Sequence, residues 1–150
     1  MSKAFVHYPG THESIDFFLQ CAQELLPDLS GWTHKNAYCI VVIYERAPIA
    51  YVVYSKVTDR NLEMSIVTTN AHWCNRKVLR HLFHYPFMTN KVARVTATCR
   101  ASNQKVTSML DRLGFCREGL LFDWYEKNEH AALYGMIKEN CKWLRQSEVN

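Results

Sequence analysis

A strand, a helix and a second strand follow one another in the middle of the chain, and this order constrains the fold most. Leu62–Thr68 is rich in apolar residues, Val78–Phe83 carries apolar residues at helical spacing, and Val92–Arg100 alternates polar and apolar residues. A helical crossover of this length joins two parallel strands. Ligands bind such sheets at the carboxyl ends of the parallel strands, so we expect a site between the loops Thr68–Arg76 and Arg100–Asn103.

The segments before this crossover predict a helix and an antiparallel meander. A helix begins at a cap on Thr11 or Ser14 and ends near Leu26, because apolar residues recur every three or four positions and a proline follows. The segments Ala37–Tyr44 and Ile49–Lys56 are rich in Val, Ile and Tyr. They predict a hairpin that is closed by the four residues between them.

The segments after the crossover predict a helix and two strands. A helix over Ser102–Leu113 ends at Gly114, a residue type that commonly ends helices in the left-handed conformation. Two strands follow, over Phe115–Trp124 and His130–Lys138, and the tail Glu139–Asn150 is predicted to contain a short helix.

The order of these elements predicts an α+β (mixed α/β) fold in a single domain, 1-150, with antiparallel strands on either side of one parallel step. Hydrophobic residues make up 48% of the 150 residues and charged residues 21%, which excludes a disordered chain or a coiled coil. No apolar run reaches the ~18 residues that a membrane-spanning helix needs. The first residues do not resemble an export signal, so we expect a cytoplasmic protein.

The chain is mildly basic, with 18 Lys and Arg against 14 Asp and Glu. Three of the cations, Arg76, Lys77 and Arg80, lie at the start of the predicted central helix, where the helix dipole disfavours positive charge. An anionic ligand would reverse this cost, and a solvated basic face is the alternative. The cysteines form no CxxC pair, and His72 with Cys74 lacks a second pair of ligands, so we expect no metal site.

The second half of the chain carries a series of motifs. They are the loop Trp73–Arg76, the run Leu79–Phe87, the strand Val92–Ala97, Asn103, Leu113-Gly114-Phe115 followed by Glu118-Gly119, and Tyr134-Gly135-Met136. In order and spacing these motifs resemble the GCN5-related N-acetyltransferase (GNAT) superfamily, and most closely its ribosomal-protein N-terminal acetyltransferase branch. The segments Tyr85–Phe87 and Cys141–Leu144 are similar to a subgroup of the superfamily that is associated with bacteriophages and prophages. A protein of that subgroup is implied to act in the cytoplasm of a host cell.

The resemblance implies a splayed mixed sheet of about six to seven strands, flanked by about four helices, that holds acetyl-CoA between its two parallel strands. The main-chain N–H groups implied to bind the pyrophosphate are those of Cys74, Asn75, Arg76 and Lys77. Those implied to bind the pantetheine and to polarise the thioester carbonyl belong to Ile66, Val67 and Thr68. Asn103 is implied to contact the cofactor or to hold the helix that follows it.

Acetyl transfer to an amine requires a proton acceptor and a proton donor. Glu63 stands where some members of the superfamily keep a base, and Tyr125 is our candidate acid, with Tyr134 as a second one. His72 is expected in the loop near the phosphate, and a nucleophilic role of Cys74 would need a base and an orienting partner that the sequence does not identify. The implied reaction is direct transfer to a primary amine of a protein N-terminus, a lysine or a small molecule. A homodimer is compatible with this reading, and neither a membrane nor a nucleic acid is expected as partner.

The sequence departs from the superfamily pattern at the predicted pyrophosphate loop. That loop contains no glycine, and Leu110 and Val106 stand where many relatives have Tyr and Ser. These departures favour an alternative, a catalytically degenerate GNAT-fold protein with a binding or virion-associated role. A nucleic-acid-binding module is disfavoured, because no pattern of stacking aromatic residues accompanies the cations. The cations in question are Arg76, Lys77, Arg80, Lys91, Arg94 and Arg100.

Overall fold

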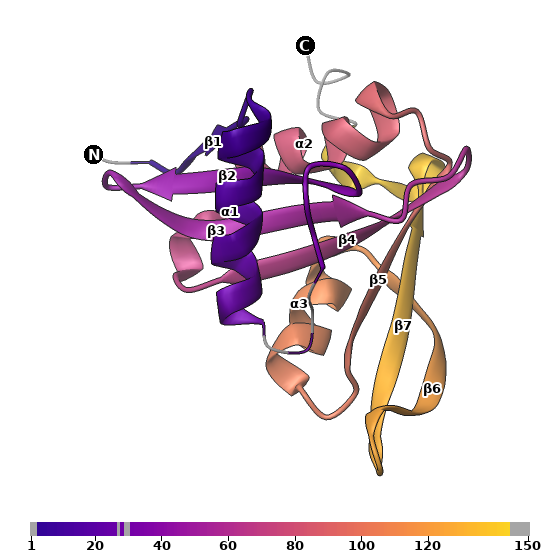
Figure 1. The fold of residues 1–150 in the computed structure, drawn as a ribbon. Helices are drawn as coiled ribbons and strands as arrows, with labels where there is room; N and C mark the ends of the chain where they lie inside the picture. The colour runs from indigo at the N-terminus through magenta and orange to yellow at the C-terminus, as the bar shows by residue number, and fades with distance from the viewer. Residues whose placement is uncertain (1–2, 27, 29–30, 145–150) are drawn as a thin grey trace.

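The computed structural model describes residues 3–26, 28 and 31–144, and these form a seven-stranded sheet flanked by three α-helices (Figure 1). The elements are β1 (Phe5–His7), α1 (His12–Leu25), β2 (Ala37–Tyr44), β3 (Ala47–Ser55), β4 (Asn61–Thr68), α2 (Arg76–His84), β5 (Arg94–Arg100), α3 (Gln104–Leu113), β6 (Cys116–Glu126) and β7 (Glu129–Ile137). The strand order is β1-β2-β3-β4-β5-β7-β6. This confirms the predicted mixed fold, with three α-helices in the described residues where about four were expected.

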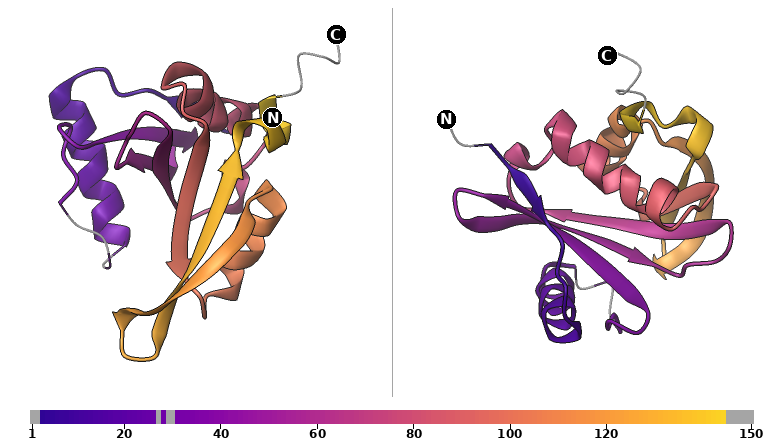
Figure 2. Two further views of the ribbon diagram at one scale, coloured as in Figure 1. Left: turned by 90° about the vertical axis from the view of Figure 1, so that its right-hand side faces the viewer. Right: turned by 90° about the horizontal axis from the view of Figure 1, so that it is seen from above.

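The sheet separates two layers of helices. Figure 2 shows α1 on one face, with α2 and α3 on the other. The alternation of β2 explains the two layers, because Cys39 and Val41 pack in the cluster under α1, whereas Ile40 and Val42 pack in the cluster under α2 and α3. All four side chains are fully buried, so both faces of the central sheet belong to the core.

The first helix begins as predicted. Thr11 is its N-cap, and its hydroxyl accepts a hydrogen bond from the N–H of Ser14 at 3.1 Å. The hydroxyl of Ser14 accepts one from the N–H of Thr11 at 3.2 Å, which completes a capping box. The short strand β1, which pairs with Val41–Ile43 at the edge of the sheet, was not predicted, because three residues are too few to show an alternating pattern.

The predicted four-residue hairpin loop between β2 and β3 is wrong. The chain turns over two residues, Glu45 and Arg46, whose φ angles are 49° and 68°. Ala47 and Pro48 already pair with the end of β2. Two-residue turns with positive φ match the right-handed twist of the flanking strands, and this favours the shorter loop.

The central helix α2 ends at His84, beside its predicted end near Tyr85-Pro86, and an additional helical turn follows it. A π-helical turn over Tyr85–Thr89 follows α2 directly, and the carbonyl of Tyr85 accepts the N–H of Asn90 at 2.9 Å. Pro86 stands at the start of this new turn, where the missing proline N–H is tolerated. The turn brings Phe87 into the core, fully buried.

The C-terminal elements follow the prediction closely. Gly114 ends α3 with a φ of 103°, which only glycine adopts readily. Part of the tail forms a short 3₁₀ turn over Lys138–Asn140, and residues 145–150 of the predicted tail helix lie outside the described part of the chain. None of the helices in residues 3–26, 28 and 31–144 is long and apolar enough to cross a bilayer.

The two strands of the crossover, β4 and β5, lie side by side only at their beginnings. They are parallel, as predicted, but the paired register starts at Asn61 with Arg94 and ends at Glu63 with Thr96. The antiparallel pairing of β5 with β7, in contrast, continues along the whole of β5. The sheet therefore splits beyond Glu63 into two arms, one formed by β1–β4 and the other by β5–β7 (Figure 1).

Candidate functional site

A pocket of about 180 Å³ opens where β4 and β5 separate. Its walls are Met64–Ile66 of β4 and Ala97–Arg100 of β5, and α3 closes one side with Val106, Met109 and Leu110. We call this the splay pocket. Leu110, where the resemblance suggested a tyrosine, contributes an apolar and buried wall here rather than a proton donor.

A larger pocket of about 630 Å³ continues from it toward the start of α2, and we call it the loop pocket. The two pockets share Leu26, Ile66, Val106 and Met109, so they form one groove. The indole of Trp73 lies on the wall of the loop pocket and is 4% exposed, so it does not block the space between the strands. Lys105 and Arg112 of α3 line the same pocket and give it positive charge.

The hydrogen-bond pattern of β4 determines which of its N–H groups face this groove. The N–H of Thr69 donates to the carbonyl of Ile49 at 2.9 Å, and the β3–β4 register continues from there without a shift. Because bonding directions alternate in an antiparallel pair, the N–H of Val67 also points toward β3, while those of Ile66 and Thr68 point toward the groove. The expectation for three consecutive ligand-facing N–H groups is therefore corrected to two, since Val67 is engaged by β3.

The loop before α2 is organised by Asn75. Its side-chain oxygen accepts the N–H of Val78 at 2.8 Å, and its amide nitrogen donates to the carbonyl of Ala4 at 3.1 Å. Asn75 has a φ of −75°, so this loop needs no left-handed residue and hence no glycine. The N–H groups of Arg76 and Lys77, in the first turn of α2, have no acceptor within the helix and are free to bind an anion.

The side chains of Cys74 and Arg76, in this loop and the first turn of α2, point to different surroundings. Cys74 lines the loop pocket and is exposed, whereas Arg76 extends toward the C-terminal turn, where its guanidinium lies 5.6 Å from the centre of the Trp143 ring. Trp143 also lines the loop pocket, and Lys142 lies 4.9 Å from the same ring. Trp143 was not predicted as a site residue, because only the tertiary packing of the tail brings it to α2.

Asn103 stands at the entrance of the splay pocket as the N-cap of α3. Its side-chain oxygen accepts the N–H of Val106 at 3.2 Å. Of its two implied roles, holding the helix that follows is therefore visible in the contacts of Asn103.

Glu63 and Tyr125, the candidate base and acid, both line the splay pocket. The ammonium of Lys56 lies 3.3 Å from the carboxylate of Glu63. Burial raises the pKa of Tyr125, while the Thr98 side chain and the charge of Arg100 act in the opposite direction. The Tyr125 phenol thus holds its proton at neutral pH.

Arg100 ties the entrance of the splay pocket together, a role that the sequence did not reveal. Its guanidinium binds both carboxylate oxygens of Asp28 at 2.8 Å and also reaches Glu129 at 3.0 Å and Glu126 at 3.3 Å. These hydrogen bonds raise the pKa of Arg100, so its guanidinium is positively charged at neutral pH. Nothing in the sequence distinguishes this arginine from the other cations, because its three acidic partners come from distant segments.

The other candidate residues lie in different surroundings. Tyr134 is buried in the core, at 1% exposed, and His72 stacks on Tyr44 with ring centres 4.5 Å apart. Arg94, one of the cations considered for nucleic-acid binding, is paired with Glu118 at 2.9 Å. Within the described residues, no group of three or more His, Cys, Asp or Glu side chains is arranged to hold a metal ion.

Comparisons with known proteins rest on structure alone, since no family model matches this chain and no curated protein matches its sequence. A mutant of spermidine N-acetyltransferase from Vibrio cholerae superimposes with a TM-score of 0.75 at 14% identity, over 97% of this chain and 98% of the other. The same enzyme crystallised with CoA and spermine gives a TM-score of 0.71 at 13% identity, over 92% and 97%.

A second enzyme, ribosomal-protein-S5-alanine acetyltransferase from Vibrio fischeri, gives a TM-score of 0.68 at 18% identity, over 95% of this chain and 98% of that one. At such identities the likeness concerns the fold, and it extends over nearly the whole of each chain. The chain therefore has the fold of the GNAT acetyltransferases.

Proposed function

We propose that the protein is an N-acetyltransferase that moves an acetyl group from acetyl-CoA to a primary amine. The observation that carries this proposal is the split between β4 and β5, where the N–H groups of Ile66 and Thr68 face a groove that leads to the start of α2. Unpaired main-chain donors beside a cavity suit an extended, amide-containing ligand with an anionic end.

The residues around the groove fit acetyl-CoA. The N–H groups of Ile66 and Thr68 would hold the pantetheine and the thioester carbonyl, and those of Arg76 and Lys77 would hold the pyrophosphate. Lys105 and Arg112 add positive charge along the same path. Acetyl-CoA supplies the acetyl group as a thioester, and a neighbour of this fold is crystallised with CoA.

Glu63 and Tyr125 supply the two proton transfers in this proposal. The Glu63 carboxylate would accept a proton from the incoming ammonium, directly or through a water molecule, so that the neutral amine can attack. The Tyr125 phenol, whose pKa burial raises, would donate its proton to the departing sulfur. Lys56, whose ammonium lies 3.3 Å from the Glu63 carboxylate, is its ion-pair partner at the edge of the splay pocket.

The finer expectations remain proposals. We infer a primary amine of a protein N-terminus, a lysine or a small molecule as acceptor, and structural neighbours act on spermidine and on the alanine of a ribosomal protein. Five further points stand as predictions of the sequence. They are the single-domain organisation, the ribosomal N-terminal acetyltransferase branch, the bacteriophage origin, the cytoplasmic location and the homodimer.

The test is ligand-induced stabilisation with a matched pair of variants. Met109 lines both parts of the groove, so Met109→Trp should fill it, whereas Met88 is exposed elsewhere and Met88→Trp should not. Acetyl-CoA should raise the melting temperature of the wild type and of Met88→Trp but not of Met109→Trp, because only a ligand that binds the folded state stabilises it. The proposal fails if acetyl-CoA at about 100 times the expected Kd, worth about 2.7 kcal/mol of stabilisation, leaves the wild type unchanged.

A measurement of CoA release, made beside the melting experiment, separates the alternative function. A catalytically degenerate GNAT-fold protein would show the acetyl-CoA shift without release of CoA in the presence of amines. The feature that favoured this alternative, the glycine-free loop, is accounted for by Asn75, whose side chain and ordinary φ let the loop turn into α2.

A further inference from the structure

A third pocket, of about 700 Å³, adjoins the splay pocket and is not used by the proposed reaction. It lies between the start of β2, the end of β3 and the segment Gly31–Asn36, and we call it the tyrosine pocket. It shares Trp32, Ser55 and Lys56 with the splay pocket, so a molecule in one can extend into the other. Its volume lies within the range of small-molecule sites, about 300–1,000 Å³.

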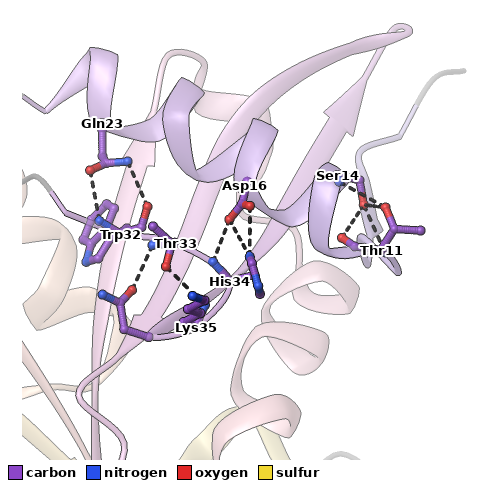
Figure 3. A network of polar contacts seen from close by, with 9 residues as sticks. Thr11, Ser14, Asp16, Gln23, Trp32, Thr33, His34 and Lys35 are labelled. Atoms are coloured by element: carbon purple, nitrogen blue, oxygen red, sulfur yellow. Dashed lines mark hydrogen bonds and ion pairs between the residues drawn. The ribbon is translucent and has the colours of Figure 1, made fainter.

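One wall of the tyrosine pocket is fastened to α1, as Figure 3 shows. The side chain of Gln23 accepts the N–H of Trp32 at 3.1 Å. The carboxylate of Asp16 accepts the main-chain N–H of His34 at 2.7 Å and lies 2.9 Å from the His34 Nδ1. Because both ends of this wall are held by α1, the pocket is formed before any ligand arrives.

Its floor is aromatic. The rings of Tyr38 and Tyr85 are stacked with centres 5.1 Å apart, and Tyr54 and Tyr85 are 4.7 Å apart. The hydroxyl of Tyr38 donates to the carbonyl of Pro9 at 2.9 Å, and that of Tyr54 donates to the carbonyl of Leu82 at 2.6 Å. Tyr54 is 1% exposed and supports the Tyr85 ring from behind, whereas the half-buried Tyr38 offers a ligand its ring rather than its hydroxyl group.

The charge of the lining is positive. Lys35 and Lys56 line the tyrosine pocket, and none of the Asp and Glu residues that the structure describes does. The Lys35 ammonium forms no ion pair or hydrogen bond with the part of the chain that the structure describes. Lys56, which both pockets share, is paired with Glu63, and Arg100 of the splay pocket is paired with Asp28. Lys35 is therefore the cation that distinguishes the tyrosine pocket from the splay pocket.

Lys56 marks the junction of the two pockets. It has a φ of 51°, a left-handed conformation that is uncommon for lysine. Such conformations persist where the surrounding structure holds them, and they are frequent at functional sites. Here the conformation turns the chain at the end of β3, and the Lys56 ammonium lies 3.3 Å from Glu63.

We propose that the tyrosine pocket binds the acidic end of a small amine acceptor. The acceptor carries a primary amine at one end, a carboxylate at the other and an apolar or aromatic spacer between them. The spacer packs on the tyrosine rings, the carboxylate pairs with Lys35, and the amine passes Lys56 to reach Glu63. A diamine of the same length would place a cation among Lys35 and Lys56, which costs electrostatic energy. This inference rests on the proposed function and specifies its substrate class.

The test compares two molecules that differ only in the end group, 4-(aminomethyl)benzoate and 1,4-bis(aminomethyl)benzene. We measure the binding of each by titration calorimetry and the acetylation of each by release of CoA. The benzoate should bind, and its kcat/KM should exceed that of the diamine by about tenfold or more, a difference of about 1.4 kcal/mol. Lys35→Gln should remove most of this preference, whereas Lys138→Gln, at an exposed lysine on a 3₁₀ turn away from the pocket, should leave it intact.

The outcomes separate this inference from the proposed function. Acetylation of the diamine at a rate equal to or above that of the benzoate would overturn the inference and leave the acetyltransferase proposal standing. Benzoate binding that Lys35→Gln does not weaken would overturn it as well, as would the absence of benzoate binding to the wild type. Benzoate binding that depends on Lys35 but occurs without turnover would support the pocket and count against the acetyltransferase proposal. Because Lys35 is exposed, we expect its variant to melt as the wild type does.

Discussion

The guanidinium of Arg100 lies 4.7 Å from the centre of the Tyr125 ring, at the entrance of the splay pocket. The same guanidinium binds Asp28 from the segment after α1 and Glu129 from β7. One side chain thus fixes the position of the candidate acid and connects it to two distant segments. A cation over an aromatic ring also favours the negative form of the phenol.

We predict that Arg100 and Tyr125 act as one unit. Tyr125→Phe should lower kcat by about 10²-fold or more, because general acid catalysis contributes about 10²–10⁴. Arg100→Gln should also lower kcat, with a smaller effect on the KM of acetyl-CoA. In a double-mutant cycle the two losses should not add, because Arg100 acts through the Tyr125 phenol. Additive losses in kcat would show that the two side chains act independently.

The second prediction concerns Glu63. Glu63→Gln should reduce kcat/KM for the amine at neutral pH, and the loss should shrink as the pH approaches the pKa of the amine, where the acceptor loses its proton without help. Lys56→Met should produce a smaller loss, because it removes the partner but leaves the carboxylate. A pH–rate profile of Glu63→Gln with the same shape as that of the wild type would exclude Glu63 as the base.

The third prediction concerns Gly135 of β7, across which Arg94 and Glu118 form a bidentate ion pair. A Cβ atom at Gly135 would overlap both side chains of this pair. Gly135→Ala should therefore displace the far ends of both side chains and break their ion pair, which costs up to about 1 kcal/mol for a partly exposed pair. Gly119→Ala is the matched control, because its Cβ would meet nothing within 4 Å. Equal midpoints of urea unfolding for the two variants would contradict this.

The fourth prediction concerns stability at low pH. Hydrogen bonds from the main chain and the side chain of His34 lower the pKa of Asp16 below its ordinary value of 3.8. The pKa of Asp16 is thus lower in the folded state than in the unfolded state. The ionised carboxylate therefore stabilises the folded protein above pH 3.8, and this stabilisation is lost as the pH falls through the folded-state pKa. Asp16→Asn should thus be less stable than the wild type at pH 6, and the difference should narrow below pH 3.8. A difference in unfolding free energy between the two proteins that is the same at pH 6 and below pH 3.8 would contradict this prediction.

The elements that the sequence predicted are those whose local pattern agrees with their tertiary surroundings. The helix capped by Thr11, the helix that ends at Gly114 and the parallel crossover each follow from spacing, caps and punctuation. The strand β1 and the π-helical turn at Tyr85–Thr89 were missed, because short segments owe their conformation to partners elsewhere in the chain.

The candidate site could be predicted only in part. The resemblance pointed to β4, the loop before α2 and Asn103, all of which border or adjoin the groove. That Val67 faces β3 depends on register, and register is set by the neighbouring strand rather than by β4 itself. The contacts of Arg100 join residues far apart in the chain, and no local pattern carries such information.

Residue-resolved amide hydrogen exchange tests the central claim most directly, because it reports on the main-chain N–H groups of β4. The account predicts that acetyl-CoA slows exchange at Ile66 and Thr68 and leaves Val67 unchanged, since the Val67 N–H is already bonded within the sheet. Unchanged exchange at Ile66 and Thr68 in saturating acetyl-CoA would contradict the account.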